Sequence, residues 1–141
     1  MIRVAINGYG RIGRSVLRAV YESKLQNQIK IVAINEPADS KTIAHLTRYD
    51  STHGRFAGEV SCDQQTLNVC GDSIAIVHQD NLEQLPWSTL NVDVVLECSG
   101  SFSDRRKAEQ HLQSGAKRVL FSQPAESDVD ATIVYLSLIH I

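Results

Sequence analysis

A glycine-rich turn near the start of this 141-residue chain joins an apolar run to a helical pattern. Residues 3–7 predict a short strand, and three glycines in the spacing G-x-G-x-x-G follow it, at Gly8, Gly10 and Gly13. Apolar residues then recur at the spacing of one helix face, at Ile12, Val16, Ala19 and Val20. A strand that passes through such a turn directly into a helix is the first half of a β-α-β unit.

The alternation of strand and helix continues along the chain. Residues 29–34 are rich in β-branched side chains and predict a second strand. Residues 92–96 and 118–121 predict two more, separated by a helix over about 104–114 that Gly115 ends. This order predicts an α/β fold, a doubly wound and mostly parallel sheet with both faces covered.

One segment departs from that alternation. Residues 66–69 and 73–77 predict a β-hairpin with a three-residue, glycine-containing connection, which we interpret as a small insertion. Before it, Asp39 or Ser40 is expected to cap a helix that contains residues 43–46. Residues 131–135 are a candidate for the last strand.

Composition excludes several classes of protein. Hydrophobic residues make up 43% and charged residues 21%, as in ordinary globular domains, and the net charge of −2 predicts no nucleic-acid or membrane partner. Neither the five histidines nor the three cysteines show the spacing of a metal site or a disulfide framework. The odd number of thiols favours a reducing, cytoplasmic location.

The glycine turn suits a pyrophosphate. The second glycine of such a turn allows a phosphate to approach the backbone, and the helix behind it offers unpaired N–H groups and the positive end of its dipole. Arg11, in the first helical turn, is a candidate to contact the anion. A glycine turn without a ligand is the alternative.

Polar residues at the ends of the other predicted strands extend this hypothesis. Glu36 lies 23 residues after Gly13, near the spacing at which a carboxylate binds the adenosine ribose. A carboxylate there would repel a 2′-phosphate, which favours NAD over NADP, although a solvated glutamate would give the same sequence. Ser99 and Gly100 follow the predicted strand over 92–96, and Ser122 follows the one over 118–121. These residues could contact the ligand, or they could be helix caps or turn residues.

Three segments together resemble the NAD-binding half of the glyceraldehyde-3-phosphate dehydrogenase family, which has a Rossmann-type fold. They are residues 7–14, 49–56 and 97–100, which read NGYGRIGR, YDSTHGRF and ECSG. The resemblance implies that Arg11 and Ile12 contact the pyrophosphate and Glu36 the ribose. The full set of cofactor-binding residues expected from the motifs is Asn7, Gly8, Gly10, Arg11, Ile12, Gly13, Glu36, Ser99, Gly100 and Ser122.

Within that family the chain is most similar to the erythrose-4-phosphate dehydrogenase branch, through residues 34–36, 85–87, 92–96 and 121–135. The resemblance implies that a cysteine thiolate attacks the aldehyde, that NAD accepts the hydride, and that water releases 4-phosphoerythronate for pyridoxal phosphate synthesis. Members of the family form homotetramers. The alternatives are the glyceraldehyde-3-phosphate branch, which uses inorganic phosphate instead of water, and a stand-alone nucleotide-binding module without catalysis.

The sequence departs from the family at two places. Gln79 and Asp80 stand where the family carries Glu-Arg, so a basic residue expected near the adenine is missing. We assign residues 1–135 to the NAD-binding domain, since residues 136–141 do not continue the family pattern and the Ser-Cys-Thr-Thr-Asn segment with the nucleophile does not occur. We therefore expect no catalytic residue, and no turnover, from these 141 residues alone.

Overall fold

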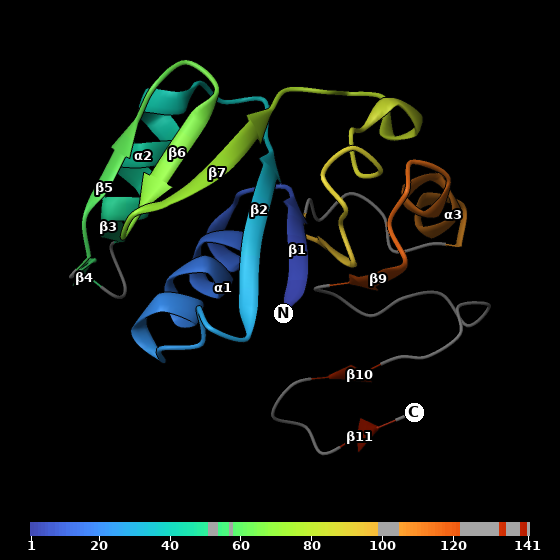
Figure 1. Cartoon of the computed structure of the whole chain (residues 1–141), viewed down its shortest axis with the longest axis horizontal. Coiled ribbons are helices and arrows are strands. Elements are labelled where there is room, and N and C mark those ends of the chain that lie inside the picture. The colour runs from blue at the N-terminus through green and yellow to red at the C-terminus, as the bar shows by residue number, and fades with distance from the viewer. Residues whose placement is uncertain (51–53, 57, 99–104, 122–132, 135–138, 141) are drawn as a thin grey trace.

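A seven-stranded sheet forms the centre of the molecule, with the strand order β5-β6-β7-β2-β1-β8-β9 (Figure 1). The computed structural model describes residues 1–50, 54–56, 58–98, 105–121, 133–134 and 139–140. The strands of the sheet are β1 (Ile2–Asn7), β2 (Ile29–Asn35), β5 (Val60–Cys62), β6 (Thr66–Val69), β7 (Asp72–Val77), β8 (Val94–Glu97) and β9 (Arg118–Phe121).

Three α-helices and one short 3-10 helix accompany the sheet in the described part of the chain. They are α1 (Arg11–Glu22), α2 (Ser40–Arg48), α3 (Arg105–Gln113) and η1 (Leu82–Gln84). Asp39, one of the two residues expected to cap this helix, caps α2. Its Oδ1 accepts a hydrogen bond from the Thr42 N–H at 2.7 Å. No helix among the described residues has the length and apolar character needed to cross a membrane.

Two small antiparallel sheets complete the described structure. One pairs β3 (Tyr49–Asp50) with β4 (Gly54–Arg55). The other pairs β10 (Ile133–Val134) with β11 (Ile139–His140). The last predicted strand, over 131–135, is therefore described only at residues 133 and 134, which join this small sheet and not the large one.

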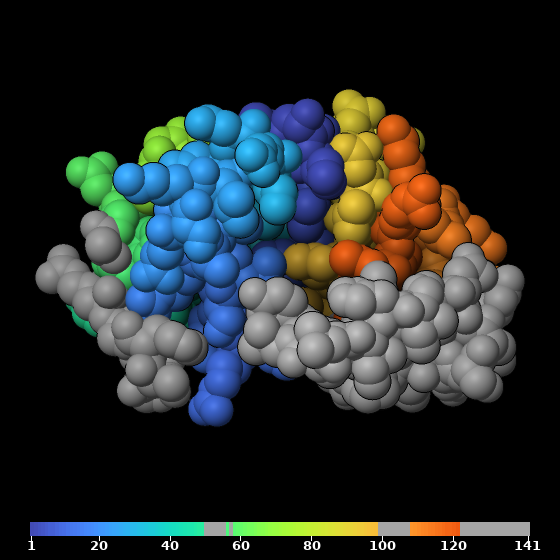
Figure 2. All heavy atoms as spheres, turned by 90° about the horizontal axis from the view of Figure 1, so that it is seen from below, coloured from blue at the N-terminus to red at the C-terminus, as the bar shows by residue number. Residues whose placement is uncertain are grey.

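The predicted α/β fold with a mostly parallel sheet is confirmed. β1 runs parallel to both of its neighbours, β2 and β8, while β7 and β9 extend the parallel arrangement on either side. Figure 2 shows the molecule from the end at which β1 and β2 begin, and residues between α1 and β2 lie at this surface. Their carboxyl ends therefore meet at the opposite end.

The predicted hairpin exists, but its connection is one residue shorter than predicted. Val69 pairs with Asp72, so the turn consists of Cys70 and Gly71 alone. Both have positive φ, 51° and 88°, which matches the twist of a two-residue hairpin. β7 of this hairpin also belongs to the parallel part of the sheet, because it lies parallel beside β2 and buries Ile74 in the shared core.

The two faces of the sheet pack against different partners. Alternate residues of β1 show this difference. Val4 and Ile6 belong to a core cluster that includes residues of α1 and α2. Ala5, which lies between them, belongs to a second cluster that includes Trp87. We call the side of the sheet with the first cluster the α1 face. We call the side with the second cluster the α3 face, because His111 of α3 contacts Trp87. Figure 1 shows α1 and α2 on one side of the molecule and α3 near β9.

The buried side of α1 differs from the side that the apolar spacing predicts. Of the predicted residues, Val20 is buried but Ile12 is 50% exposed. The full set that the helix buries is Gly13, Leu17, Arg18, Val20 and Tyr21. A Cβ on Gly13 would lie 2.6 Å from the carbonyl oxygen of Gly8, so only glycine fits where the helix touches the turn. Leu17 follows Gly13 after about one helical turn, and Val20 and Tyr21 follow after about two.

A register shift in β2 aligns the ends of the central strands. Val4 pairs with Ile31 and Ala5 with Ala33, so one residue of β2 is skipped. The shift places Asn35 opposite Asn7 at the carboxyl ends.

Candidate functional site

A cleft of about 370 Å³ opens where β1, β2 and β7 end. Its lining comprises Asn7 and Gly8 at the end of β1, Asn35 and Pro37 at the end of β2, residues 78–82 after β7, and Gln110 of α3. The chain leaves β1 toward β2 on one side and later adds β8 on the other. Ligands of open α/β sheets bind at such a switch point, outside the carboxyl ends of the strands.

The glycine turn borders this cleft and has room for a phosphate. Gly8 has a φ of 94°, which favours glycine, and its N–H bonds the carbonyl of Asn35 at 2.9 Å. A Cβ on Gly10 would meet no atom within 4 Å, so the turn is open beside this residue. No side chain caps α1 at Gly10, and the first helical turn of α1 carries no acidic residue. The N-terminus of α1 therefore suits an anionic group.

Two further predicted contacts lie at the start of the same helix. Arg11 and Ile12 are both exposed, so neither side chain is committed to the core. The side chain of Tyr9, in contrast, is buried and its hydroxyl lies 2.6 Å from Thr47 Oγ1 of α2. Burial raises the pKa of Tyr9 to about 12, so this phenol stays neutral and anchors the turn from behind.

Glu36 connects the end of β2 to the glycine turn. Its Oε1 accepts the Tyr9 N–H at 2.9 Å, and its Oε2 accepts the Ala38 N–H at 3.1 Å. The residue is half-buried, so it is not the purely solvated strand-end glutamate of the alternative interpretation. An ionised carboxylate has about four acceptor sites, which leaves capacity for the hydroxyls of a ribose.

Three predicted site residues, Ser99, Gly100 and Ser122, lie outside the described residues. β8 ends at Glu97 and β9 at Phe121, so the chain enters both segments from the carboxyl ends of the parallel strands.

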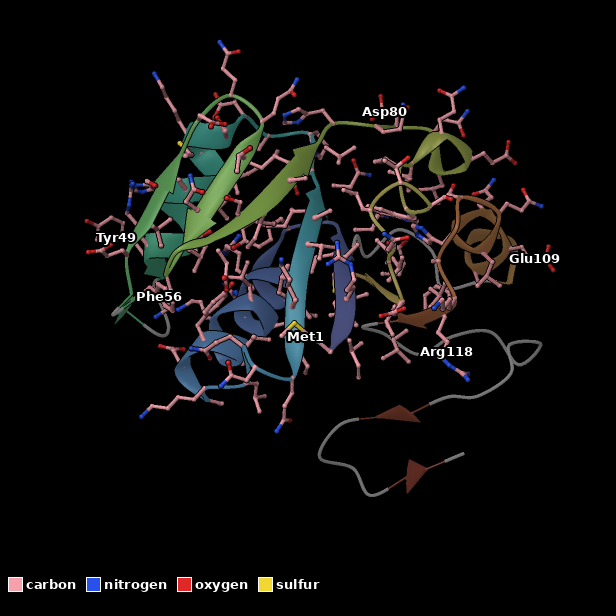
Figure 3. The ribbon with its side chains drawn as sticks, in the orientation of Figure 1. Met1, Tyr49, Phe56, Asp80, Glu109 and Arg118 are labelled. Atoms are coloured by element: carbon pink, nitrogen blue, oxygen red, sulfur yellow. The ribbon has the colours of Figure 1, made fainter. Side chains whose placement is uncertain are left out.

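The wall of the cleft after β7 carries the two residues that depart from the family pattern. Gln79 and Asp80 both line it, and Figure 3 shows Asp80 on the segment between β7 and η1. The lining contains no lysine or arginine in the part of the chain that the structure describes. His78 contacts the opposite wall, with its Nδ1 at 2.7 Å from the carbonyl oxygen of Glu36.

A buried line of polar side chains runs inward from the cleft along the α3 face. We call it the polar row, and its members are Asn35, Asn7, Glu97, His111 and Trp87. Consecutive members are hydrogen-bonded at 2.7, 2.8, 2.6 and 3.1 Å. All five are at most 7% exposed.

Sequence reasoning missed Asn35, Gln110 and most of the wall over 78–82. A signal for Asn35 was present, because both central strands end in the dipeptide Ile-Asn and parallel strands align their carboxyl ends. No comparable signal pointed to Glu97 or His111. In the described part of the chain, His, Cys, Asp and Glu form no group of three that could hold a metal ion.

Comparison with protein families agrees with this geometry. The family model described as "Glyceraldehyde 3-phosphate dehydrogenase, NAD binding domain" matches residues 2–105. The match spans the glycine turn, Glu36 and the wall of the cleft after β7, and it makes NAD the dinucleotide of this domain. The chain belongs to the glyceraldehyde 3-phosphate dehydrogenase family and carries its NAD-binding domain.

Proposed function

We propose that the cleft and the glycine turn hold NAD for the oxidation of an aldehyde phosphate. The observation that carries this proposal is the open, uncapped start of α1 beside a carboxylate that the turn itself binds. In this arrangement residues 8–13 bind the pyrophosphate, and Glu36 binds the adenosine ribose. Asn7 supports the turn, while Ser99, Gly100 and Ser122 contact the rest of the dinucleotide.

Glu36 also sets the preference for NAD over NADP. Its carboxylate is fixed by two backbone N–H groups, so it cannot easily turn away from a ligand. A 2′-phosphate on the ribose would meet this negative charge at close range. We expect NADP to bind about thirtyfold more weakly than NAD, and Glu36→Gln to narrow that ratio.

NAD, when bound, supplies the hydride acceptor. The substrate that we propose is erythrose 4-phosphate, supported by the similarity of residues 34–36, 85–87, 92–96 and 121–135 to that branch of the family. Glyceraldehyde 3-phosphate is the alternative substrate, since the family match favours neither branch. The three cysteines are free thiols, which supports the cytoplasm as the location.

NAD binding is tested by titration calorimetry with Gly10→Val. The variant should fold normally, because a Cβ there meets no atom, yet its side chain would occupy the space beside the turn. We expect its Kd for NAD to rise by about a hundredfold or more. Ala19→Val is the matched control, since it adds the same side chain at an exposed position of α1. Equal NAD binding by Gly10→Val and Ala19→Val would refute the site.

The substrate is tested on a protein that joins this domain to a catalytic domain. NADH formation from erythrose 4-phosphate without inorganic phosphate would support the proposal. Faster, phosphate-dependent turnover of glyceraldehyde 3-phosphate would replace it with the alternative. Binding of NAD without oxidation of either aldehyde would favour a nucleotide-binding module.

A further inference from the structure

Two ionisable residues of the polar row, Glu97 and His111, lie behind the cleft and do not line it. Glu97 is 2% exposed and His111 is 0% exposed. His111 Nε2 lies 2.6 Å from Glu97 Oε2, although the two residues come from different elements, β8 and α3. Burying a carboxylate costs free energy unless the group is well hydrogen-bonded. The presence of the Glu97–His111 pair in the interior therefore requires a functional explanation.

The direction of every hydrogen bond in the polar row follows from its inner end. The indole N–H of Trp87 can only donate, so it fixes His111 Nδ1, 3.1 Å away, as an acceptor. The proton of the neutral ring is then on Nε2, which donates to Glu97 Oε2. The same oxygen accepts from the Asn7 Nδ2–H at 2.8 Å, which sets the orientation of that amide.

The outer end of the polar row holds the wall of the cleft. Because the Asn7 amide is oriented by Glu97, its Oδ1 is available to accept from Asn35 Nδ2 at 2.7 Å. Asn35 in turn holds both backbone groups of Gln79, accepting from its N–H at 2.9 Å and donating to its carbonyl at 2.9 Å. Gln79 begins the stretch that forms this wall.

The far end of the wall is attached to α3 as well. Ser114, directly after α3, donates from Oγ to the carbonyl of Leu82, the last residue of the wall. The segment from Gln79 to Leu82 is therefore held at both ends by contacts that lead back to α3.

We propose that Glu97 and His111 are positioning residues, which fix the Gln79 wall of the adenosine side of the NAD cleft through Asn7 and Asn35. The proposal rests on the proposed function for its ligand. Neither Glu97 nor His111 lines the cleft, so each acts through the side-chain amides of Asn7 and Asn35.

The first test is hydrogen exchange of the Gln79 amide, which needs no ligand. Glu97→Met removes the acceptor at similar volume, whereas Glu97→Gln keeps an acceptor oxygen. We expect the Met variant to exchange the Gln79 amide about tenfold faster or more, and the Gln variant to stay within about threefold of the wild type. Leu67→Ala is the control, because Leu67 is buried on the α1 face and loss of its side chain destabilises the whole fold.

The second test is calorimetry with NAD and with ADP-ribose on the same proteins. The Kd for both ligands should rise by about tenfold in Glu97→Met and recover in Glu97→Gln. Should Glu97→Met fail to fold, His111→Leu replaces it, with His111→Gln as the variant that keeps a donor and an acceptor.

The outcomes separate this proposal from the proposed function. Equal protection of Gln79 in Glu97→Met and Leu67→Ala, at equal global stability, would refute the positioning role. Loss of Gln79 protection with unchanged Kd values would refute its link to the cleft. If the wild type binds no NAD, the proposed function fails, and the exchange data still decide whether the pair positions the wall.

Discussion

The two faces of the central sheet are built from alternate residues of the same strands, yet they carry different chemistry. The α1 face is apolar along its strands, with Ile6, Ile31 and Ile34 fully buried against α1 and α2. The α3 face begins with small residues such as Ala5 and Ala33 and ends in the polar row.

This difference follows from the pleat of the strands. Ile6 and Asn7 are neighbours in sequence but point to opposite faces, and the same holds for Ile34 and Asn35. Each strand can thus contribute to a dry core and to the cleft at its carboxyl end. Substitutions on the α1 face should therefore reduce stability without changing NAD binding.

The largest expected effect is on the α1 face. Leu17→Ala removes a side chain with no exposed surface and should lower the free energy of unfolding by about 2–5 kcal/mol. The Kd for NAD, corrected for the folded fraction, should not change, because Leu17 does not line the cleft. Urea unfolding and calorimetry measure the two quantities. Leu112→Ala is the control, since Leu112 is 44% exposed on α3.

A smaller loss of stability is expected at the inner end of the polar row. Trp87→Phe keeps an aromatic ring but removes the N–H that donates to His111, leaving a buried acceptor unsatisfied. The free energy of unfolding should fall by about 1–3 kcal/mol in urea titrations followed by circular dichroism. A variant as stable as the wild type would mean that His111 finds another donor.

At the mouth of the cleft the effect should be on binding alone. Asp80→Arg replaces an exposed acid on the cleft wall by the basic residue that the resemblance to the family implies at this position. Attraction to the phosphates and the adenine ring should strengthen NAD binding by about 0.5–1 kcal/mol, and less at high salt. The control is Glu83→Arg, the same charge reversal on η1 away from the cleft lining. An equal gain in both variants would indicate a non-specific charge effect.

The smallest effect lies at the other end of the strands and depends on pH. The Arg3 N–H donates to Asp93, and Lys117 lies 3.2 Å from the same carboxylate; both lower the pKa of Asp93 below its ordinary value. The ionised form therefore stabilises the fold above the ordinary pKa of aspartate, and this contribution is lost as the pH falls through the lowered pKa.

Asp93→Asn should accordingly lower the Tm at neutral pH, and the difference from the wild type should shrink as the solution is acidified. Thermal unfolding across acidic pH measures it. Asp63→Asn, in the loop between β5 and β6, controls for the loss of one exposed acidic group. A difference that stays constant with pH would contradict the assignment to Asp93.

Local pattern was sufficient where the structure depends on residues close in sequence. The strand over 118–121 has the predicted bounds, and the glycine turn joins β1 to α1 as predicted. Local pattern failed for the buried side of α1, because a missing Cβ at Gly13 outweighs the apolar spacing. It also failed for the hairpin, whose place beside β2 depends on strand pairing.

The sequence by itself determined the order of strands and helices, the glycine turn between β1 and α1, and the family, since these depend on residues close together in the chain. Only the tertiary structure decided the register that sets Asn35 opposite Asn7, and the contacts of Asn7 with Glu97. Asn7 and Asn35 are 28 residues apart and Asn7 and Glu97 are 90 apart, distances over which local spacing carries no information. Strand pairing and the pleat bring these polar groups together, because parallel strands end at one edge and point alternate side chains to the same face.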